Sequence, residues 1–434
     1  MAERMKLGVA RRVITPKIGC MLYGYSSQPH ATGVHDDLTV TVHLFTWQKT
    51  KVMLISATVC GFRTDIADEL RRILSEQFDV PFEHIVLSAT HTHSGPALAG
   101  MHSAWGGFNE EYYDQIFKPT LIAAAREALE NVEPVTMATA VGESKVGVNR
   151  RELTGENKVK LGQNEWGPYN PKMAIMSFQD ECGKVKANLI SYGAHGTSAG
   201  ASTLITRDWS GIMTDALEQH TGAVTSFLLG PEGDVGPRNA SREGETGIPR
   251  MEALGALAAK DALRIFETLS EYKDVTLSVS SDFLRIPLMP RIPYEEACRR
   301  SEEISSGVMY NMQSVQYEFF EKVKKTYEEG NYVEREYMEI PQTVFRIGDM
   351  AFATFQYEIF SEIGMRIDKE VPDLNVISLV CTNGQAGYFP TRSQICLGGY
   401  EIIMFRHAKP QRFVDDADYY LMKETIRNIN NLNA

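Results

Sequence analysis

The 434-residue sequence lacks several features that mark particular classes of protein. It has no run of about 20 apolar residues, the length that a membrane-spanning helix requires. Its six cysteines are scattered without a CxxC pair, which argues against a disulfide framework or a thiolate zinc site. The N-terminal residues 1–12 are mixed and charged, unlike a signal peptide. We therefore expect a cytoplasmic protein with reduced thiols and no membrane segment.

The sequence also lacks an excess of basic residues, since 44 Lys and Arg stand against 56 Asp and Glu and the net charge is −12. This balance argues against a nucleic-acid partner or an anionic membrane surface. Apolar residues make up 43% and charged residues 23%, as in soluble globular proteins. A small-molecule substrate is therefore the expected partner, and the sequence leaves the oligomeric state open.

Strand-like and helix-like segments alternate along the chain, with no internal repeat, low-complexity tract or linker rich in Pro, Gly or Ser. Residues 84–89 and 375–380 are short apolar runs, typical of strands buried on both faces. A helix is predicted over 110–131, kinked or split at Pro119, which has no backbone N–H. We expect a mixed α/β (α+β) fold, with one large domain over residues 1–434 whose layered mixed sheets are flanked by helices.

The clearest motif is Thr-His-Thr-His-Ser-Gly-Pro at 90–96, directly after the first of these apolar runs. On an extended segment the side chains of His91 and His93 point the same way, so they can converge on one ion. Neutral imidazole is a good zinc ligand, and the small neighbours leave room for a metal and a substrate. Two half-buried histidines that close a loop would give the same pattern, so both interpretations stay open at this point.

Three further strand ends carry candidate ligands. His195 follows a β-rich run and is flanked by small residues. Asp234 lies in a loop rich in Gly and Pro, where it could orient a ligand histidine, bind a second, harder cation such as Ca2+ or Mg2+, or only cap the turn. Glu358 follows an apolar strand, where a carboxylate could stabilise a helix N-terminus or complete a His/His/Glu zinc set. A later loop presents Tyr388 and Arg392, which alone would be ordinary surface residues.

These motifs occur in order along one chain. The matching stretches are GVARRVITP (8–16), GVHDDL (33–38), THTHSGP (90–96), AHGTS (194–198), GDVGP (233–237), the segment 358–366, and Tyr388 followed by Tyr400-Glu401. As a set they resemble the catalytic domain of the neutral/alkaline, non-lysosomal ceramidase family. The resemblance covers nearly the whole sequence, and the ordered combination makes it specific where no single motif would.

The resemblance implies one zinc ion per chain, held by His91, His195, Glu358 and Tyr388 together with a water molecule. It also implies that His93, Arg150 and Tyr400 surround the scissile amide. Zinc lowers the pKa of bound water to roughly 7, which generates hydroxide for attack on an amide or ester carbonyl. Tyr400 and His93 would donate hydrogen bonds to the developing oxyanion, and Glu358 would pass a proton to the leaving nitrogen.

Two departures from the family pattern concern the substrate. The family carries a serine where this sequence has Gly236. Its larger members continue into a C-terminal β-sandwich domain, and we expect the catalytic domain alone here. The sequence therefore predicts a zinc-dependent hydrolase that cleaves the amide of an N-acyl compound smaller or more polar than ceramide. A zinc lactonase or esterase is the nearest alternative, and a non-catalytic protein that binds zinc or a ligand is the third.

Overall fold

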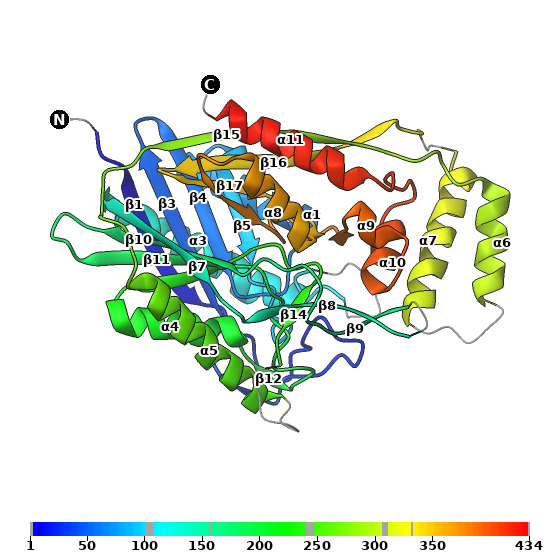
Figure 1. Ribbon diagram of the computed structural model, residues 1–434, viewed down its shortest axis with the longest axis horizontal. Helices are drawn as coiled ribbons and strands as arrows, with labels where there is room; N and C mark the ends of the chain where they lie inside the picture. The colour runs from blue at the N-terminus through cyan, green and yellow to red at the C-terminus, as the bar shows by residue number, and fades with distance from the viewer. Residues whose placement is uncertain are drawn as a thin grey trace.

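The computed structural model describes residues 3–99, 107–155, 158–239, 247–305, 311–330 and 333–432. Three sheets of four or five strands form the body of the molecule (Figure 1). In spatial order the first contains β5 (Ile85–Ala89), β4 (Thr50–Ala57), β3 (Thr39–Trp47), β1 (Lys6–Val13) and β6 (Glu133–Pro134). The second contains β13 (Val224–Leu229), β11 (Val185–Tyr192), β10 (Lys172–Gln179) and β7 (Thr136–Glu143). The third contains β19 (Asn375–Leu379), β17 (Met350–Thr354), β16 (Tyr337–Ile347) and β15 (Leu277–Pro287).

The three sheets share one chain path, although the sequence contains no repeat. In each, an antiparallel hairpin is followed by a helix and then by a strand that pairs in parallel with the second hairpin strand. The connecting helices are α1 (Thr64–Phe78), α4 (Trp209–Thr221) and α8 (Ser361–Glu370). Parallel strands have their carboxyl ends at the same edge of a sheet, and this edge is where α/β proteins place their sites. The path therefore gives each sheet two neighbouring loops at that edge.

Apolar side chains from all three sheets meet in one inner cluster. Phe45 packs on Phe178 with ring centroids 5.4 Å apart, and Phe345 stacks on Phe352 at 4.4 Å. All four rings are fully buried, and each buried ring contributes roughly 1.5–3 kcal/mol to folding. This cluster fixes the sheets relative to one another and so fixes the loops at their edges.

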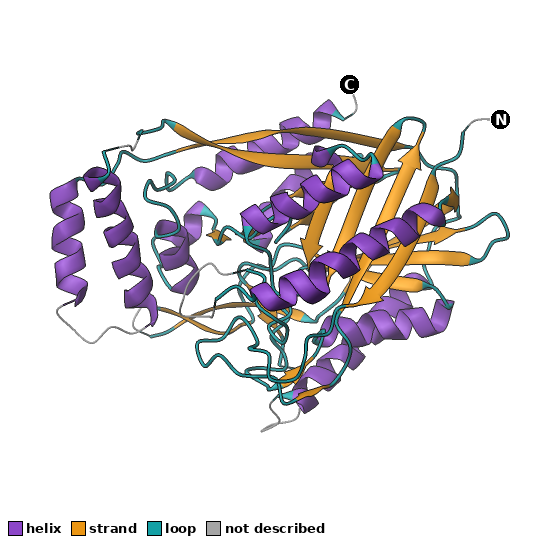
Figure 2. Cartoon of the chain, turned by 180° about the vertical axis from the view of Figure 1, so that it is seen from behind, coloured by secondary structure: helices purple, strands orange, loops and turns teal. Residues whose placement is uncertain are grey.

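Helices cover the outer faces of the sheets (Figure 2). The first sheet is covered by α1 and α3 (Lys118–Glu130), and the second by α4 and α5 (Ile248–Phe266). The third is covered by α8 and α11 (Ala417–Asn431), and α11 lies along β15 and β16 in Figure 1. The predicted class, a mixed α/β fold with layered mixed sheets flanked by helices, is confirmed. None of the described helices is both long and apolar enough to cross a membrane.

Smaller elements complete the chain. A helical hairpin of α6 (Tyr294–Ser305) and α7 (Asn311–Glu328) lies at the far end of the molecule from most of the strands (Figure 1). The short strands are β2 (Gly33–Val34), β8 (Gly147–Leu153), β9 (Val159–Asn164), β12 (Leu204–Ile205), β14 (Val235–Pro237), β18 (Glu358–Ile359) and β20 (Tyr388–Phe389). The short helices are a 3-10 turn at Phe82–His84, α2 (Glu110–Tyr112), a π-helical turn at Tyr113–Phe117, α9 (Arg392–Ile395) and α10 (Tyr400–Arg406).

Candidate active site

His91 and His93 lie just beyond β5, and their side chains meet. Their Nε2 atoms are 3.2 Å apart. The expectation that the two side chains converge because the segment is extended is wrong, however, because His91 has φ +63°. This left-handed conformation is uncommon for a residue with a side chain and costs free energy, which the surrounding structure must offset. Convergence of the pair thus depends on the fold around the loop and not on the spacing of two residues along a strand.

Backbone carbonyls fix the tautomers of the two deeply buried histidines. Nδ1 of His91 lies 2.7 Å from the carbonyl oxygen of Cys60. Nδ1 of His195 lies 3.0 Å from the carbonyl oxygen of Glu232 and 3.1 Å from that of Val235. A carbonyl only accepts, so each ring carries its proton on Nδ1 and its Nε2 is left as an acceptor. Burial, and then the charge of Arg150, lowers the pKa of His195 to about 3, so this ring is neutral near pH 7.

Glu358 faces these two Nε2 atoms. Its Oε1 accepts a hydrogen bond of 2.8 Å from Nε2 of Gln385. Its Oε2 lies 3.2 Å from Nε2 of His195 and 3.6 Å from Nε2 of His91, and it has no hydrogen-bond partner among the described residues. Burial alone would raise the pKa of Glu358. The neighbouring His91 and His195 rings and the hydroxyl of Tyr388 favour the ionised carboxylate and hold that pKa well below its usual range. Three buried acceptor atoms therefore face one another, an arrangement that a divalent cation satisfies.

Glu232 is a second carboxylate at this cluster, and the sequence analysis did not single it out. His91, His195, Glu232 and Glu358 each offer one potential ligand atom, and these atoms lie within 4.8 Å of one another. Glu232 is fully buried, and its Oε2 has no hydrogen-bond partner among the described residues. Burial and the charge of Glu358 raise the pKa of Glu232 well above its usual range. Its place beside Asp234 in the Gly-Pro loop was the available signal, because that loop follows a buried strand.

Asp234 has a different position. Its Oδ1 accepts from the backbone N–H of Ser361 at 2.7 Å, and its Oδ2 accepts from Nδ2 of Asn149 at 3.1 Å and from Oγ of Ser361 at 3.2 Å. These bonds tie the loop to the start of α8. Burial raises the pKa of Asp234 to about 6. Among the described residues, Asp234 belongs to neither group of side chains that could hold a metal ion, so nothing in this region points to a second cation.

Tyr388, Tyr400 and Arg150 line the open side of the cluster. Pairing of β18 with β20 sets Glu358 directly opposite Tyr388, and the Tyr388 and Tyr400 rings are 5.4 Å apart. A register shift in β8 at Arg150 turns its side chain toward the site, as β-bulges do next to active sites. Nη1 of Arg150 lies 2.8 Å from Nε2 of His195. A cation bound at that lone pair would replace this bond and free the guanidinium to face the cavity.

Glu401 holds Arg150 in place, and this role was not predicted. Oε1 of Glu401 lies 2.8 Å from Nε of Arg150, and Oε2 lies 2.6 Å from Nη1 of Arg151. The carboxylate is fully buried, so both ion pairs are shielded from water. Glu401 adjoins Tyr400 in α10 and therefore couples the position of the arginine to that of the tyrosine.

A cavity of about 500 Å³ opens onto this cluster. The predicted residues that line it are His93, Arg150, His195, Tyr388 and Tyr400. Gly236 also lines it, at the position where the family pattern has serine. Arg392 is exposed on α9 and does not line it. The remaining predicted ligands, His91 and Glu358, lie in the buried wall behind His93 and Tyr388.

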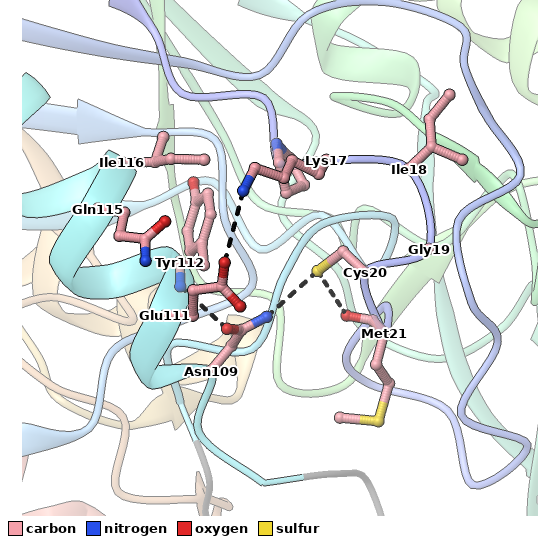
Figure 3. A pocket seen from close by; sticks show the side chains of 11 residues that line it. Lys17, Ile18, Gly19, Cys20, Met21, Asn109, Glu111, Tyr112, Gln115 and Ile116 are labelled. Carbon is pink, nitrogen blue, oxygen red and sulfur yellow. Dashed lines mark hydrogen bonds and ion pairs between the residues drawn. The ribbon is translucent and has the colours of Figure 1, made fainter.

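A second cavity, of about 340 Å³, lies between the segment 16–21 and α2 (Figure 3). Nδ2 of Asn109 lies 3.4 Å from Sγ of Cys20, and Nζ of Lys17 lies 3.5 Å from Oε1 of Glu111. None of the predicted catalytic or metal-binding residues lines this cavity. The chemistry is therefore expected at the histidine cluster.

Comparison with known proteins agrees with this geometry. The family model for neutral/alkaline non-lysosomal ceramidase, N-terminal, matches residues 5–245. The chain belongs to this family. Neutral ceramidase A of Dictyostelium discoideum is 25% identical over 219 residues, which are 46% of this chain and 30% of that protein. Neutral ceramidase of Pseudomonas aeruginosa is 22% identical over 225 residues, which are 48% of this chain and 33% of that protein. The matches thus span about a third of the length of these curated relatives.

Solved structures extend the likeness to the whole chain. The crystal structure of neutral ceramidase from Pseudomonas aeruginosa gives a TM-score of 0.76 at 18% identity, covering 98% of this chain and 74% of that one. A ceramidase complexed with C2 gives a TM-score of 0.75 at 17% identity, covering 99% of this chain and 75% of that one. At these identities the likeness shows a shared fold.

Proposed function

We propose that this protein is a zinc-dependent hydrolase that cleaves the amide bond of an N-acyl substrate. The observation that carries the proposal is the set of three buried acceptor atoms, on His91, His195 and Glu358, beside a cavity. Nitrogen and oxygen donors without cysteine, on a site with an open side, match catalytic zinc better than structural zinc. When bound, such an ion polarises a carbonyl and lowers the pKa of water to about 7.

The residues around the cluster have the protonation states that this reaction needs. Burial, and then Glu358, raises the pKa of Tyr400, so its hydroxyl remains a donor at neutral pH. Arg150 and Tyr400 are the donors for the oxyanion, a type of contact whose loss costs about 3–4 kcal/mol in the transition state. Burial, followed by His91 and His195, lowers the pKa of His93 well below its usual value, so this ring is neutral and orients the carbonyl without adding charge. Glu358 is ionised, which suits a metal ligand, and the leaving nitrogen gains the proton that the attacking water loses.

The relatives narrow the reaction class. They are named neutral ceramidases, which indicates an N-acyl amide as the scissile group. Because this chain spans only about a third of their length in the matches, the choice between ceramide and a smaller or more polar amide needs its own test.

The test combines metal content with a substrate panel. Purified protein should carry about one zinc per chain, and it should release fatty acid from N-acyl amides until a chelator is added and again after zinc is restored. The Glu358→Gln variant should lose both zinc and activity, whereas Glu370→Gln, at an exposed position of α8, should lose neither. Turnover of lactones alone, with every amide and ceramide inert, would favour the lactonase alternative over the amidase. Folded protein without zinc and without turnover of any probe would contradict the proposal.

A further inference from the structure

The cavity has an unusual charge for this protein. Among its described lining residues, the charged side chains are those of two arginines, Arg150 and Arg250, and none is Asp or Glu. The chain as a whole carries a net charge of −12. A cleft of one sign with low-dielectric walls concentrates ligands of the opposite sign. The local charge of the cavity therefore favours a ligand that the overall charge would repel.

The two arginines differ in how their charge is compensated. Arg150 is paired with the buried Glu401. Within the ranges that the structure describes, Arg250, on α5, donates to two backbone carbonyls, from Nε to Ser198 at 2.8 Å and from Nη2 to Thr197 at 3.3 Å. Among the described residues it has no carboxylate within ion-pair distance. Within the described part of the chain, its guanidinium is thus held in the cavity wall by carbonyl groups without a counter-charge beside it.

The carbonyl groups that hold Arg250 lie close to the proposed reaction centre. Thr197 and Ser198 lie two and three residues after His195 in the chain, so the carbonyls that hold the guanidinium belong to the loop of a proposed metal ligand. Asp208 lies near this loop, but its carboxylate accepts from the N–H groups of Ser198, Ala199 and Trp209 and from the hydroxyl of Ser198. Asp208 does not line the cavity.

Tyr25 supplies a second hydrogen-bond donor to the cavity. It lines the same cavity, its ring meets that of His93 at 5.3 Å, and its hydroxyl is buried with no hydrogen-bond partner among the described residues. Burial, and then the charge of Asp208, raises the pKa of Tyr25 well above its usual value, so the hydroxyl is a donor at neutral pH. A buried donor that lacks an acceptor is destabilising, and a ligand with an acceptor group would offset this cost.

We propose that the substrate carries an oxyanion, a carboxylate or a phosphate, which Arg250 and Tyr25 bind while Arg150 and Tyr400 hold the scissile carbonyl. This inference rests on the proposed hydrolase function and narrows it to anionic N-acyl compounds, such as acylated amino acids. Guanidinium binds such groups through charge-assisted hydrogen bonds, often in pairs. A neutral amide such as ceramide would leave the charge of Arg250 without a counter-charge.

The test uses pairs of probes in which one member carries a negative charge and the other is neutral. One pair is N-hexanoylglycine and its isosteric amide, N-hexanoylglycinamide, and the other is N-hexanoylethanolamine with and without a phosphate ester. Hydrolysis by the zinc-loaded enzyme is measured as kcat and KM, and binding of each probe is measured by calorimetry. We expect the anionic member of at least one pair to be favoured by about tenfold or more, mainly through KM. The pair that shows the preference identifies the oxyanion as carboxylate or phosphate.

Variants assign the preference to the two residues. R250Q should bring the ratio of anionic to neutral probe close to one, and R250K should retain part of it. Y25F, which removes only a hydroxyl, should reduce the ratio without abolishing it. R299Q removes an exposed guanidinium from α6 and should keep the wild-type ratio. The thermal midpoint of each variant shows whether it is folded. If R250Q does not fold, the result for Y25F decides the test.

The outcomes separate the two proposals. Preferential binding of an anionic probe that is lost in R250Q supports the oxyanion site even if no probe is hydrolysed, and that result would contradict the hydrolase. Hydrolysis of both members of each pair with equal kcat/KM would overturn the oxyanion site and leave the hydrolase in place. A preference that persists in folded R250Q and Y25F, or no binding of any anionic probe, also overturns it.

Discussion

Glu358 and Tyr388 are direct cross-strand partners in the two-stranded parallel sheet of β18 and β20. They are 30 residues apart in sequence, and each lies just after a strand of the third sheet. The pairing places the carboxylate and the phenol on neighbouring strands at the carboxyl edge, opposite the loops that carry His91 and His195. Each of the three sheets thus contributes to the cluster from the same edge.

Glu232→Gln tests whether the second carboxylate contributes to metal binding. Glutamine has the same size but no charge to offer a cation, so we expect zinc to bind about tenfold more weakly, a loss of about 1.4 kcal/mol. Melting temperatures with and without zinc measure this, because a ligand stabilises by its affinity for the folded state. The metal-free variant should melt close to the wild type. An undiminished zinc-induced increase in melting temperature would show that Glu232 is not a ligand.

Glu401→Gln tests the buried ion pairs with Arg150 and Arg151. Removing one partner leaves buried positive charge uncompensated, so the free energy of unfolding should fall by about 3–5 kcal/mol. Urea denaturation measures the change. Glu339→Gln, which breaks an exposed pair with Arg285, should change it by less than about 1 kcal/mol. Equal effects of the two substitutions would mean that burial adds nothing to the Glu401 network.

Gly196→Ala tests the close approach of the two histidine loops. Gly196 forms a bridge with Thr92, and a Cβ at position 196 would lie 2.8 Å from the carbonyl oxygen of His91. The loops must move apart to accept it, and ligands held a few tenths of an ångström out of place bind metal more weakly. Zinc titration should show a loss of about tenfold or more. Gly155→Ala, whose Cβ would meet nothing within 4 Å, should leave zinc affinity unchanged.

The sequence predicted the parts of the fold and site that depend on short stretches of chain. Buried strands followed by small residues indicated the loops of His91, His195 and Glu358. The helix predicted over 110–131 is split as Pro119 requires, into α2, a π-helical turn and α3. The roles of these residues, the single domain over 1–434, the cytoplasmic location and the zinc itself stay predictions.

Other parts of the site depend on contacts that no local pattern contains. The Gly-Pro loop carries both Glu232 and Asp234, and only the tertiary turn decides that Glu232 points to the histidines while Asp234 anchors α8. Arg250 and Tyr25 are 225 positions apart in the numbering, and they line one cavity only because the loops of the site bring them together. The shared path of the three sheets is equally invisible in the sequence, since hydrophobic strands can carry many different side chains.

His43, in β3, predicts how stability depends on pH. Burial lowers the pKa of His43 to about 3, whereas an unfolded histidine titrates near 6.5. The unfolded state therefore binds the extra proton between these values. The stability that comes from keeping His43 neutral is fully present above about pH 6.5 and is lost as the pH falls toward 3. At pH 5 the loss is about 2 kcal/mol.

His43→Gln removes this titration and keeps a donor for the carbonyl of Leu54, which lies 3.3 Å from Nδ1 of His43. The free energy of unfolding, measured by urea denaturation at pH 7 and pH 5, should fall less in the variant than in the wild type. Comparing the two proteins removes the effect of carboxylate titration on the free energy of unfolding, because the same carboxylates titrate in both. His220→Gln, at an exposed histidine of α4, should behave as the wild type does. An identical loss in His43→Gln and wild type would show that His43 is protonated in the folded protein.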